Sequence, residues 1–325
     1  MVVNILKTSK PIAIVTFSIF CVLFFAGLFF YDFSFSFSKS GYPLYDLLIV
    51  LTFNKVWLTK LITILLILLL SMGWNNLIYD KFILSISSVL PASFVLIISL
   101  FFPFSPVWPV TFLLLFFLNN LLSIFQVDKP YLSLFDAGLL LGFCFLFYPP
   151  SIVFLITLFA ANFIYGSISW RCFVIPFVAF ILPFILYLAY LFCFSSTDSV
   201  IDHYINSIGL SVPTIILPNY SVPFVLISLF IFVFSLLELI KWLPKKSLKS
   251  RKAFILLFTF SFSVFLSFFI QSNEGWSNAL LFVLPFSVLC SNYFLFAQKK
   301  WWYESLYALI LISAFYFLIR SIVAF

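Results

Sequence analysis

Four ionisable residues in the first sixty positions could perform chemistry together. Asp32 directly follows the first long apolar run, and Asp46 comes fourteen positions later. Lys55 and Lys60 stand at the start of the second apolar run. A carboxylate near a membrane surface can act as a general base on an acceptor hydroxyl or amide, and a nearby cation can hold a phosphate leaving group. These residues are therefore candidate catalytic (Asp32, Asp46) and substrate-binding (Lys55, Lys60) groups. The same residues could instead form a hydrated loop with snorkelling lysines.

A second polar segment, residues 195–222, holds the one histidine of the chain. His203 follows Asp202, and the pair could contact a substrate, bind a metal ion or shuttle protons. A lone histidine in a polar loop is more often only solvated. We assign His203 and Asp202 to substrate binding and predict no metal site. The sequence contains no Walker A, GxGxxG, HExxH or GxSxG motif, so it indicates no nucleotide hydrolysis and no common protease or lipase chemistry, and it identifies no cofactor.

The composition requires that these residues be positioned by a membrane protein. Of the 325 residues, 65% are hydrophobic, 22% aromatic and only 8% charged, and the mean hydropathy is +1.24. A soluble domain is about half apolar and about a quarter charged, so a water-soluble fold is excluded. The net charge of +7 is then typical of cytoplasmic loops of a membrane protein rather than of nucleic-acid binding.

The apolar runs predict an all-α transmembrane bundle of about eleven helices in a single integral membrane domain, residues 1–325. The fifth and sixth runs are short and meet at Pro149-Pro150, so they could also form one broken, re-entrant unit. The predicted helices are Pro11–Tyr31, Val56–Trp74, Phe82–Phe102, Val110–Val127, Leu132–Tyr148, Ser151–Tyr165, Cys172–Phe194, Pro223–Leu243, Ala253–Gln271, Ala279–Phe296 and Ser305–Val323.

The basic residues predict the orientation of this bundle. With the N-terminus inside and eleven helices, 13 of the 17 Lys and Arg residues fall on the cytoplasmic side, six of them in or beside a basic loop at 244–252. Lys39, Lys55, Lys60 and Arg320 remain outside. The sequence therefore predicts a multi-pass membrane protein with long outside loops at 32–55 and 195–222. In the first of these loops, apolar residues around Asp46 recur with helical spacing and predict a short amphipathic helix at the interface.

Two helices and the first outside loop carry a family resemblance. An acid, Asp32, directly follows helix one, and an amphipathic stretch lies in the loop behind it. The segment DAGLLLGFCFLFYPPSIVFLITLF (136–159) is a Gly-containing apolar helix that ends in a proline turn, and NALLFVLPFSVLCSNYFLF (278–296) is a late helix with a central Pro285. This layout resembles the GT-C superfamily of polytopic glycosyltransferases, which use polyprenyl-phosphate-linked donors. Many GT-C enzymes carry a second acid or a histidine close to the first acid in this loop. Here the next acid is Asp46, fourteen positions after Asp32. The chain also resembles an uncharacterised family of bacterial envelope proteins, and this resemblance implies a multi-pass protein of the bacterial inner membrane.

The resemblance implies a GT-C-like core that acts on or binds a polyprenyl-phosphate-linked glycan at its outer face, with Asp32 as the base. Two other functions remain open. The chain could be a non-catalytic scaffold or anchor subunit of an envelope complex, or a carrier for a lipid or small molecule. The expected partners are membrane lipids, a polyprenyl-phosphate-linked sugar and other envelope proteins, without nucleic acid.

Overall fold

The computed structural model describes residues 2–8, 10–30, 42–52, 55–194, 204, 221–270 and 275–323. Every regular element in these segments is a helix, so the all-α prediction is confirmed. The α-helices are α1 (Val2–Leu6), α2 (Pro11–Phe30), α3 (Pro43–Leu51), α4 (Val56–Asp80), α5 (Leu90–Ser99), α6 (Val107–Ser123), α7 (Tyr131–Phe147), α8 (Phe154–Tyr165), α9 (Trp170–Phe194), α11 (Val222–Trp242), α12 (Leu248–Ser267), α13 (Val283–Phe296) and α14 (Lys300–Val323). Short 3₁₀ segments are η1 (Pro149–Val153), η3 (Leu243–Lys245) and η4 (Gly275–Phe282).

Six stretches of this bundle are long and apolar enough to cross a membrane, among the residues that the structure describes. Each of the eleven predicted ranges overlaps a helix, but five of these helices are shorter than 18 residues over their described length. Large apolar side chains face outward along the long helices, as expected when lipid is the solvent. On α9 they include Val174, Phe177, Val178, Leu186 and Phe192. The chain thus has the character of a polytopic membrane protein.

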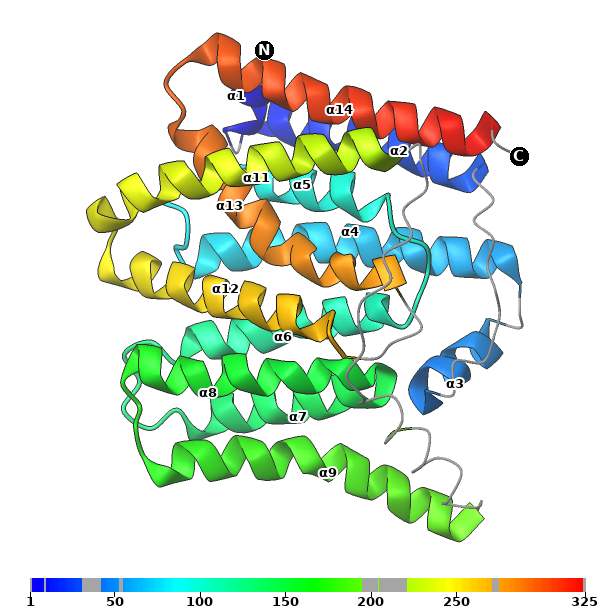
Figure 1. Cartoon of the computed structure of the whole chain (residues 1–325), viewed down its shortest axis with the longest axis vertical. Coiled ribbons are helices and arrows are strands. Elements are labelled where there is room, and N and C mark those ends of the chain that lie inside the picture. The colour runs from blue at the N-terminus through cyan, green and yellow to red at the C-terminus, as the bar shows by residue number, and fades with distance from the viewer. Residues whose placement is uncertain are drawn as a thin grey trace.

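The long helices lie side by side and run alternately in opposite directions (Figure 1). The connections α1–α2, α4–α5, α6–α7, α8–α9, α11–α12 and α13–α14 meet at one end of the bundle. All 13 cations predicted for the cytoplasmic side lie in or next to these connections, and so at one end of the bundle. We call this the basic end. The starts of α3 and α4 lie at the opposite end.

Helix α5 is much shorter than predicted. The sequence pattern predicts one helix over Phe82–Phe102, whereas the structure has helix only from Leu90 to Ser99. Phe82 has a left-handed backbone with φ of 55°, and Pro91 fits only the first turn of a helix because its ring blocks the preceding turn. All ten residues of α5 are buried. The apolar run therefore belongs to the interior of the bundle and is too short to span a bilayer alone.

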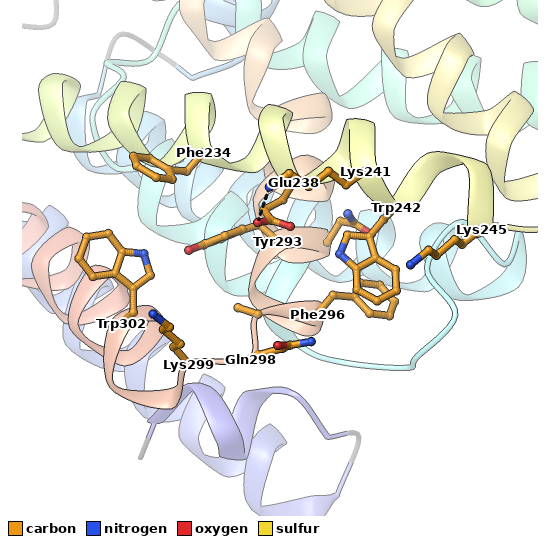
Figure 2. A pocket seen from close by; sticks show the side chains of 12 residues that line it. Phe234, Glu238, Lys241, Trp242, Lys245, Tyr293, Phe296, Gln298, Lys299 and Trp302 are labelled. Atoms are coloured by element: carbon orange, nitrogen blue, oxygen red, sulfur yellow. Dashed lines mark hydrogen bonds and ion pairs between the residues drawn. The ribbon is translucent and has the colours of Figure 1, made fainter.

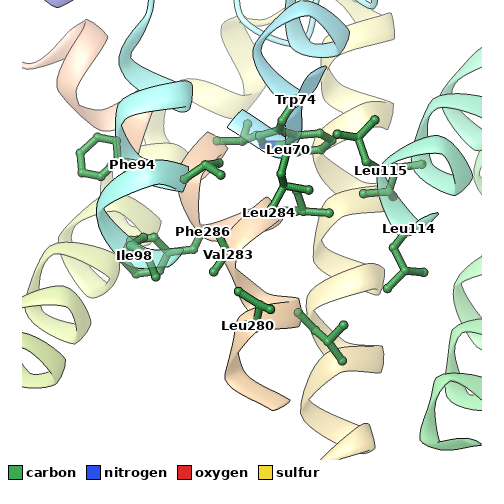
Figure 3. Packing of buried hydrophobic residues seen from close by; sticks show 14 of the residues in the cluster. Leu70, Trp74, Phe94, Ile98, Leu114, Leu115, Leu280, Val283, Leu284 and Phe286 are labelled. Carbon is green, nitrogen blue, oxygen red and sulfur yellow. The ribbon is translucent and has the colours of Figure 1, made fainter. Parts of the chain in front are cut away.

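Helix α13 supplies the facing side of this interior. Figure 3 shows Val283, Leu284 and Phe286 of α13, together with Leu280 of the preceding η4, packed among α4, α5 and α6. The indole N–H of Trp74 on α4 donates to the Ser287 hydroxyl over 2.8 Å, and Trp74 is fully buried. Phe94 on α5 lies 5.3 Å from Phe294, measured between ring centroids. The centre of the bundle is thus built from helices that are distant in sequence.

Two glycines let α7 and α9 approach closely. Gly138 and Gly142 lie four residues apart on α7, and so on one face of it. A Cβ atom on Gly138 would overlap the carbonyl oxygen of Pro176 and lie 2.9 Å from the Pro176 Cα atom. A Cβ atom on Gly142 would overlap the carbonyl oxygen of Phe180. The backbones of the two helices are therefore in direct contact at these positions.

The Pro149-Pro150 turn separates two antiparallel helices (Figure 1). Helix α7 ends at Phe147, and Tyr148 is extended with φ of −156°, which removes it from the helix. The two prolines then open η1, whose 3₁₀ turn leads directly into α8. Within this region the chain reverses direction at the end of the bundle opposite the basic end.

Candidate functional site

Two of the predicted substrate-binding residues come together at the opposite end of the bundle. Lys55 caps α4, and Lys60 lies in its second turn. With Val56 and Trp57 they line a surface depression of about 480 Å³. Lys55 is exposed, Lys60 is half-buried, and Trp57 is 51% exposed. The depression therefore joins two cations to the exposed face of an indole ring.

Asp46 lies elsewhere on the same end. It belongs to the first turn of α3, is half-buried, and does not line the depression of Lys55 and Lys60. The predicted amphipathic helix is confirmed as α3. Tyr45 and Ile49 of this helix are buried, whereas its Leu47 and Leu51 are 56% and 66% exposed, as an interfacial helix requires.

The neighbours of Asp46 form a cluster of buried phenols. Tyr42, directly before α3, meets Tyr148 edge-to-face with 6.3 Å between ring centroids. The Tyr148 hydroxyl is hydrogen-bonded to the Asn278 side-chain oxygen, and the Tyr204 hydroxyl donates to the Leu146 carbonyl over 3.2 Å. Burial raises the pKa of Tyr204, and the nearby phenols of Tyr187 and Tyr42 and the charge of Asp46 raise it further. The Tyr204 phenol consequently remains a neutral hydrogen-bonding group near the Asp46 carboxylate.

Three other predicted site residues lie outside the described residues. They are Asp32, Asp202 and His203. Their assignment stays a prediction.

The sequence prediction missed a pocket at the basic end (Figure 2). It has a volume of about 480 Å³ and lies between the end of α11, the end of α13 and the start of α14. Lys241, Lys245 and Lys299 line it together with one acid, Glu238. The Lys241 ammonium lies 3.4 Å from a Glu238 carboxylate oxygen. One carboxylate against three ammonium groups leaves an excess of positive charge.

Aromatic side chains form much of the wall of this pocket. Trp242 and Phe296 stack with 5.0 Å between ring centroids, and Phe234 meets Trp302 edge-to-face at 6.2 Å. Figure 2 shows the two pairs on opposite sides, with Tyr293 between them. The pocket thus combines cations with extended apolar surface.

One polar side chain of the pocket has no partner. Asn292 on α13 lines the cavity and is fully buried. Neither its amide nitrogen nor its amide oxygen has a hydrogen-bond partner among the described residues. Buried amides are normally paired, because leaving one unpaired costs about 1 to 3 kcal/mol. Within the described part of the chain, Asn292 is thus an unpaired buried amide in the wall of the cavity.

A lysine beside the pocket has an unusual environment. The Lys246 ammonium lies 4.9 Å from the ring centroid of Phe254 and 5.0 Å from that of Phe296. Burial lowers the pKa of Lys246 to about 8, because the charged form loses hydration there.

We expect Lys246 to react with acylating reagents ahead of other lysines at pH 8. At pH 8 about half of the Lys246 side chains are in the neutral, nucleophilic form, whereas a lysine of ordinary pKa, about 10.4, is almost fully protonated. Timed labelling followed by peptide mass spectrometry measures this, with the exposed Lys129 as the comparison. Equal labelling rates for the two lysines would contradict the assignment.

The same shift affects stability. Because the unfolded chain holds the Lys246 proton more tightly than the folded chain does, the contribution of Lys246 to the free energy of unfolding should rise as pH rises from about 8 to about 10.

A family model matches residues 1–325, the whole chain, and it describes a family of unknown function, DUF6427. The chain belongs to the DUF6427 family. No curated protein and no solved structure matches it. DUF6427 membership therefore carries no activity by itself, and the function has to be argued from the two ends of the bundle.

Proposed function

We propose that the protein is a bacterial inner-membrane protein with about eleven membrane-embedded helices and a GT-C-like core, which acts on or binds a polyprenyl-phosphate-linked glycan at its outer face. The outer face is the end of the bundle opposite the basic end, since cytoplasmic loops collect Lys and Arg. The observation that carries the proposal is the shared depression of Lys55, Trp57 and Lys60.

The chemistry of this depression fits a lipid-linked phosphate. Lys55 and Lys60 provide ammonium groups for phosphate oxygens, and charge-assisted hydrogen bonds of this kind are about twice as strong as neutral ones. Both lysines lie in the first turns of a 25-residue helix, whose N-terminal dipole also favours an anion. The exposed Trp57 indole offers an apolar face at the depth where tryptophans are enriched in membrane proteins.

The proposed reaction is transfer of the sugar to an acceptor hydroxyl. Asp32 takes the acceptor proton, the acceptor oxygen forms the new glycosidic bond, and the bond from the sugar to phosphate breaks. The polyprenyl phosphate leaves with that electron pair, held by Lys55 and Lys60. Asp46 is the second acid of this proposal, and it is supported by its place on α3 beside hydrogen-bonding phenols.

Binding of a C55 polyprenyl phosphate to the protein in nanodiscs, followed by native mass spectrometry, tests the proposal. We expect the double variant Lys55→Ala/Lys60→Ala to bind at least about tenfold more weakly, because two ion pairs to phosphate are lost. The matched control is Lys10→Ala/Lys129→Ala, which removes two exposed lysines at the basic end and should leave binding unchanged. Equal affinity in parent and Lys55→Ala/Lys60→Ala would overturn the proposal.

The Asp32→Asn variant distinguishes catalysis from binding alone. With normal expression, unchanged profiles of lipid-linked sugars would contradict the role of Asp32 as a base. If that variant were also to co-purify with another envelope protein at fixed stoichiometry, the scaffold function would replace the enzymatic one.

A further inference from the structure

We propose that the pocket between α11, α13 and α14 is a second binding site, which takes the headgroup of an anionic phospholipid that bears a hydroxyl group, of the phosphoglycerol class. The site is at the basic end, away from Lys55 and Lys60, so it is independent of the function proposed above.

The charge of the pocket selects for an anion. Its three lysines come from two separate parts of the chain. Lys241 lies in the last turn of α11 and Lys245 ends η3, whereas Lys299 directly precedes α14. Lys245 is held over the Trp242 ring, with its ammonium 5.0 Å from the ring centroid. Glu238 offsets one charge through its ion pair with Lys241. Two positive charges remain in the lining, so the pocket attracts an anion such as a phosphate diester.

The unpaired amide of Asn292 adds a requirement for both a donor and an acceptor. Its NH₂ group can donate to a phosphate oxygen, and its carbonyl oxygen can accept from a hydroxyl. A phosphoglycerol headgroup offers both within one small group, whereas a phosphocholine headgroup offers no donor. The buried amide therefore favours a phosphoglycerol headgroup over a phosphocholine headgroup.

The place of the pocket favours a lipid over a soluble phosphate ester. It opens where α11 and α13 end and next to the basic loop 244–252. Tryptophans at helix ends and clustered lysines mark the headgroup layer of a membrane, where anionic lipids are concentrated. The volume of about 480 Å³ is in the usual range for small-ligand sites, about 300 to 1,000 Å³. The wall formed by Trp242, Phe296, Phe234 and Trp302 can cover the first carbons of the lipid chains.

The decisive variant is Asn292→Leu, because a bound lipid and a purely structural amide predict opposite results. If Asn292 serves a ligand, removing an unpaired buried amide should keep or raise the melting temperature of lipid-free protein in detergent. The same variant should retain phosphatidylglycerol at least about tenfold more weakly in native mass spectrometry. The matched control is Asn162→Leu, because Asn162 is equally buried but donates to the Cys172 carbonyl over 3.0 Å. That control should lose stability without a change in lipid selectivity.

Two further measurements complete the test. Lys245→Gln/Lys299→Gln should weaken phosphatidylglycerol binding and leave phosphatidylcholine binding unchanged. Soluble glycerol phosphate should compete poorly, since it lacks the chains that the aromatic wall covers. Equal retention of phosphatidylglycerol by the parent and Asn292→Leu, or equal binding of the two lipids by the parent, would overturn the proposal. Tight binding of glycerol phosphate in the absence of lipid would overturn the lipid assignment and indicate that the site binds a soluble phosphate ester.

Discussion

Replacing Gly138 with alanine should separate α7 from α9 and lower the free energy of unfolding by about 3 kcal/mol, the upper end of the usual cost of overpacking. The added Cβ atom would overlap the Pro176 carbonyl oxygen and lie 2.9 Å from the Pro176 Cα atom. Both atoms belong to the backbone of α9, so the clash cannot be relieved by a side-chain rotation. One helix has to move, and the packing between the two helices is lost with it. Reversible unfolding of the protein in bicelles measures the effect.

The neighbouring glycine provides a second measurement, and a distant glycine provides the control. Gly142→Ala should also destabilise, because its Cβ atom would overlap the Phe180 carbonyl oxygen. Gly73→Ala on α4 introduces the same methyl group, 3.3 Å from a methyl carbon of Leu115, which can rotate away. Alanine is also the better helix former by about 1 kcal/mol, so Gly73→Ala should be close to neutral. If Gly138→Ala unfolded like the parent and like Gly73→Ala, the close approach of α7 and α9 would be wrong.

Replacing Trp74 with alanine should cost about 3 to 5 kcal/mol, as large-to-small changes of aromatic residues in a packed core do. Trp74 is fully buried and lies among Leu70, Leu115 and Leu284 at the meeting of three helices (Figure 3). In a bilayer the unfolded helices face lipid rather than water, so the loss comes from packing and from the hydrogen bond to Ser287. Unfolding in bicelles again provides the measurement.

A graded series separates these two contributions. Trp74→Phe removes the hydrogen bond but retains most of the ring, so it should cost only about 1 to 2 kcal/mol. The Ser287 hydroxyl then still donates to the Leu284 carbonyl over 2.8 Å. Trp301→Ala is the control, because Trp301 is 78% exposed. A loss for Trp301→Ala as large as that for Trp74→Ala would contradict the packing described for Trp74.

Much of the helical arrangement could be predicted because it depends on local patterns. A run of about twenty apolar residues specifies a long helix, and scattered cations specify which connections share an end. The proline pair at 149–150 and the helical spacing of leucines around Asp46 were equally local signals, and each coincides with a helix boundary or a helix. The extent of α5 could not be found in this way, since residues 82–89 are as apolar as the helix behind them.

The candidate sites also divide into those that local sequence patterns indicate and those that only the tertiary structure reveals. Lys55 and Lys60 share a depression because they are neighbours on one helix, which the sequence already indicates. Asp46 instead lies beside Tyr204, and that placement depends on how α3 packs against α7. The lipid site proposed at the basic end depends on Asn292. In the sequence, however, Asn292 is one amide within an apolar helix, as Asn162 is. Only the tertiary structure shows that Asn162 has a partner and that Asn292 lacks one among the described residues.

The buried position of α5 constrains the order in which the protein is assembled. Ten residues rise about 15 Å as a helix, about half of a bilayer core, so α5 cannot be threaded through the membrane as an independent unit. Phe94 meets Phe294 and Tyr307, residues that are synthesised long after α5. The contacts of α5 with α13 and α14 can therefore form only after those two helices have been synthesised, and a chain arrested before α13 would lack them.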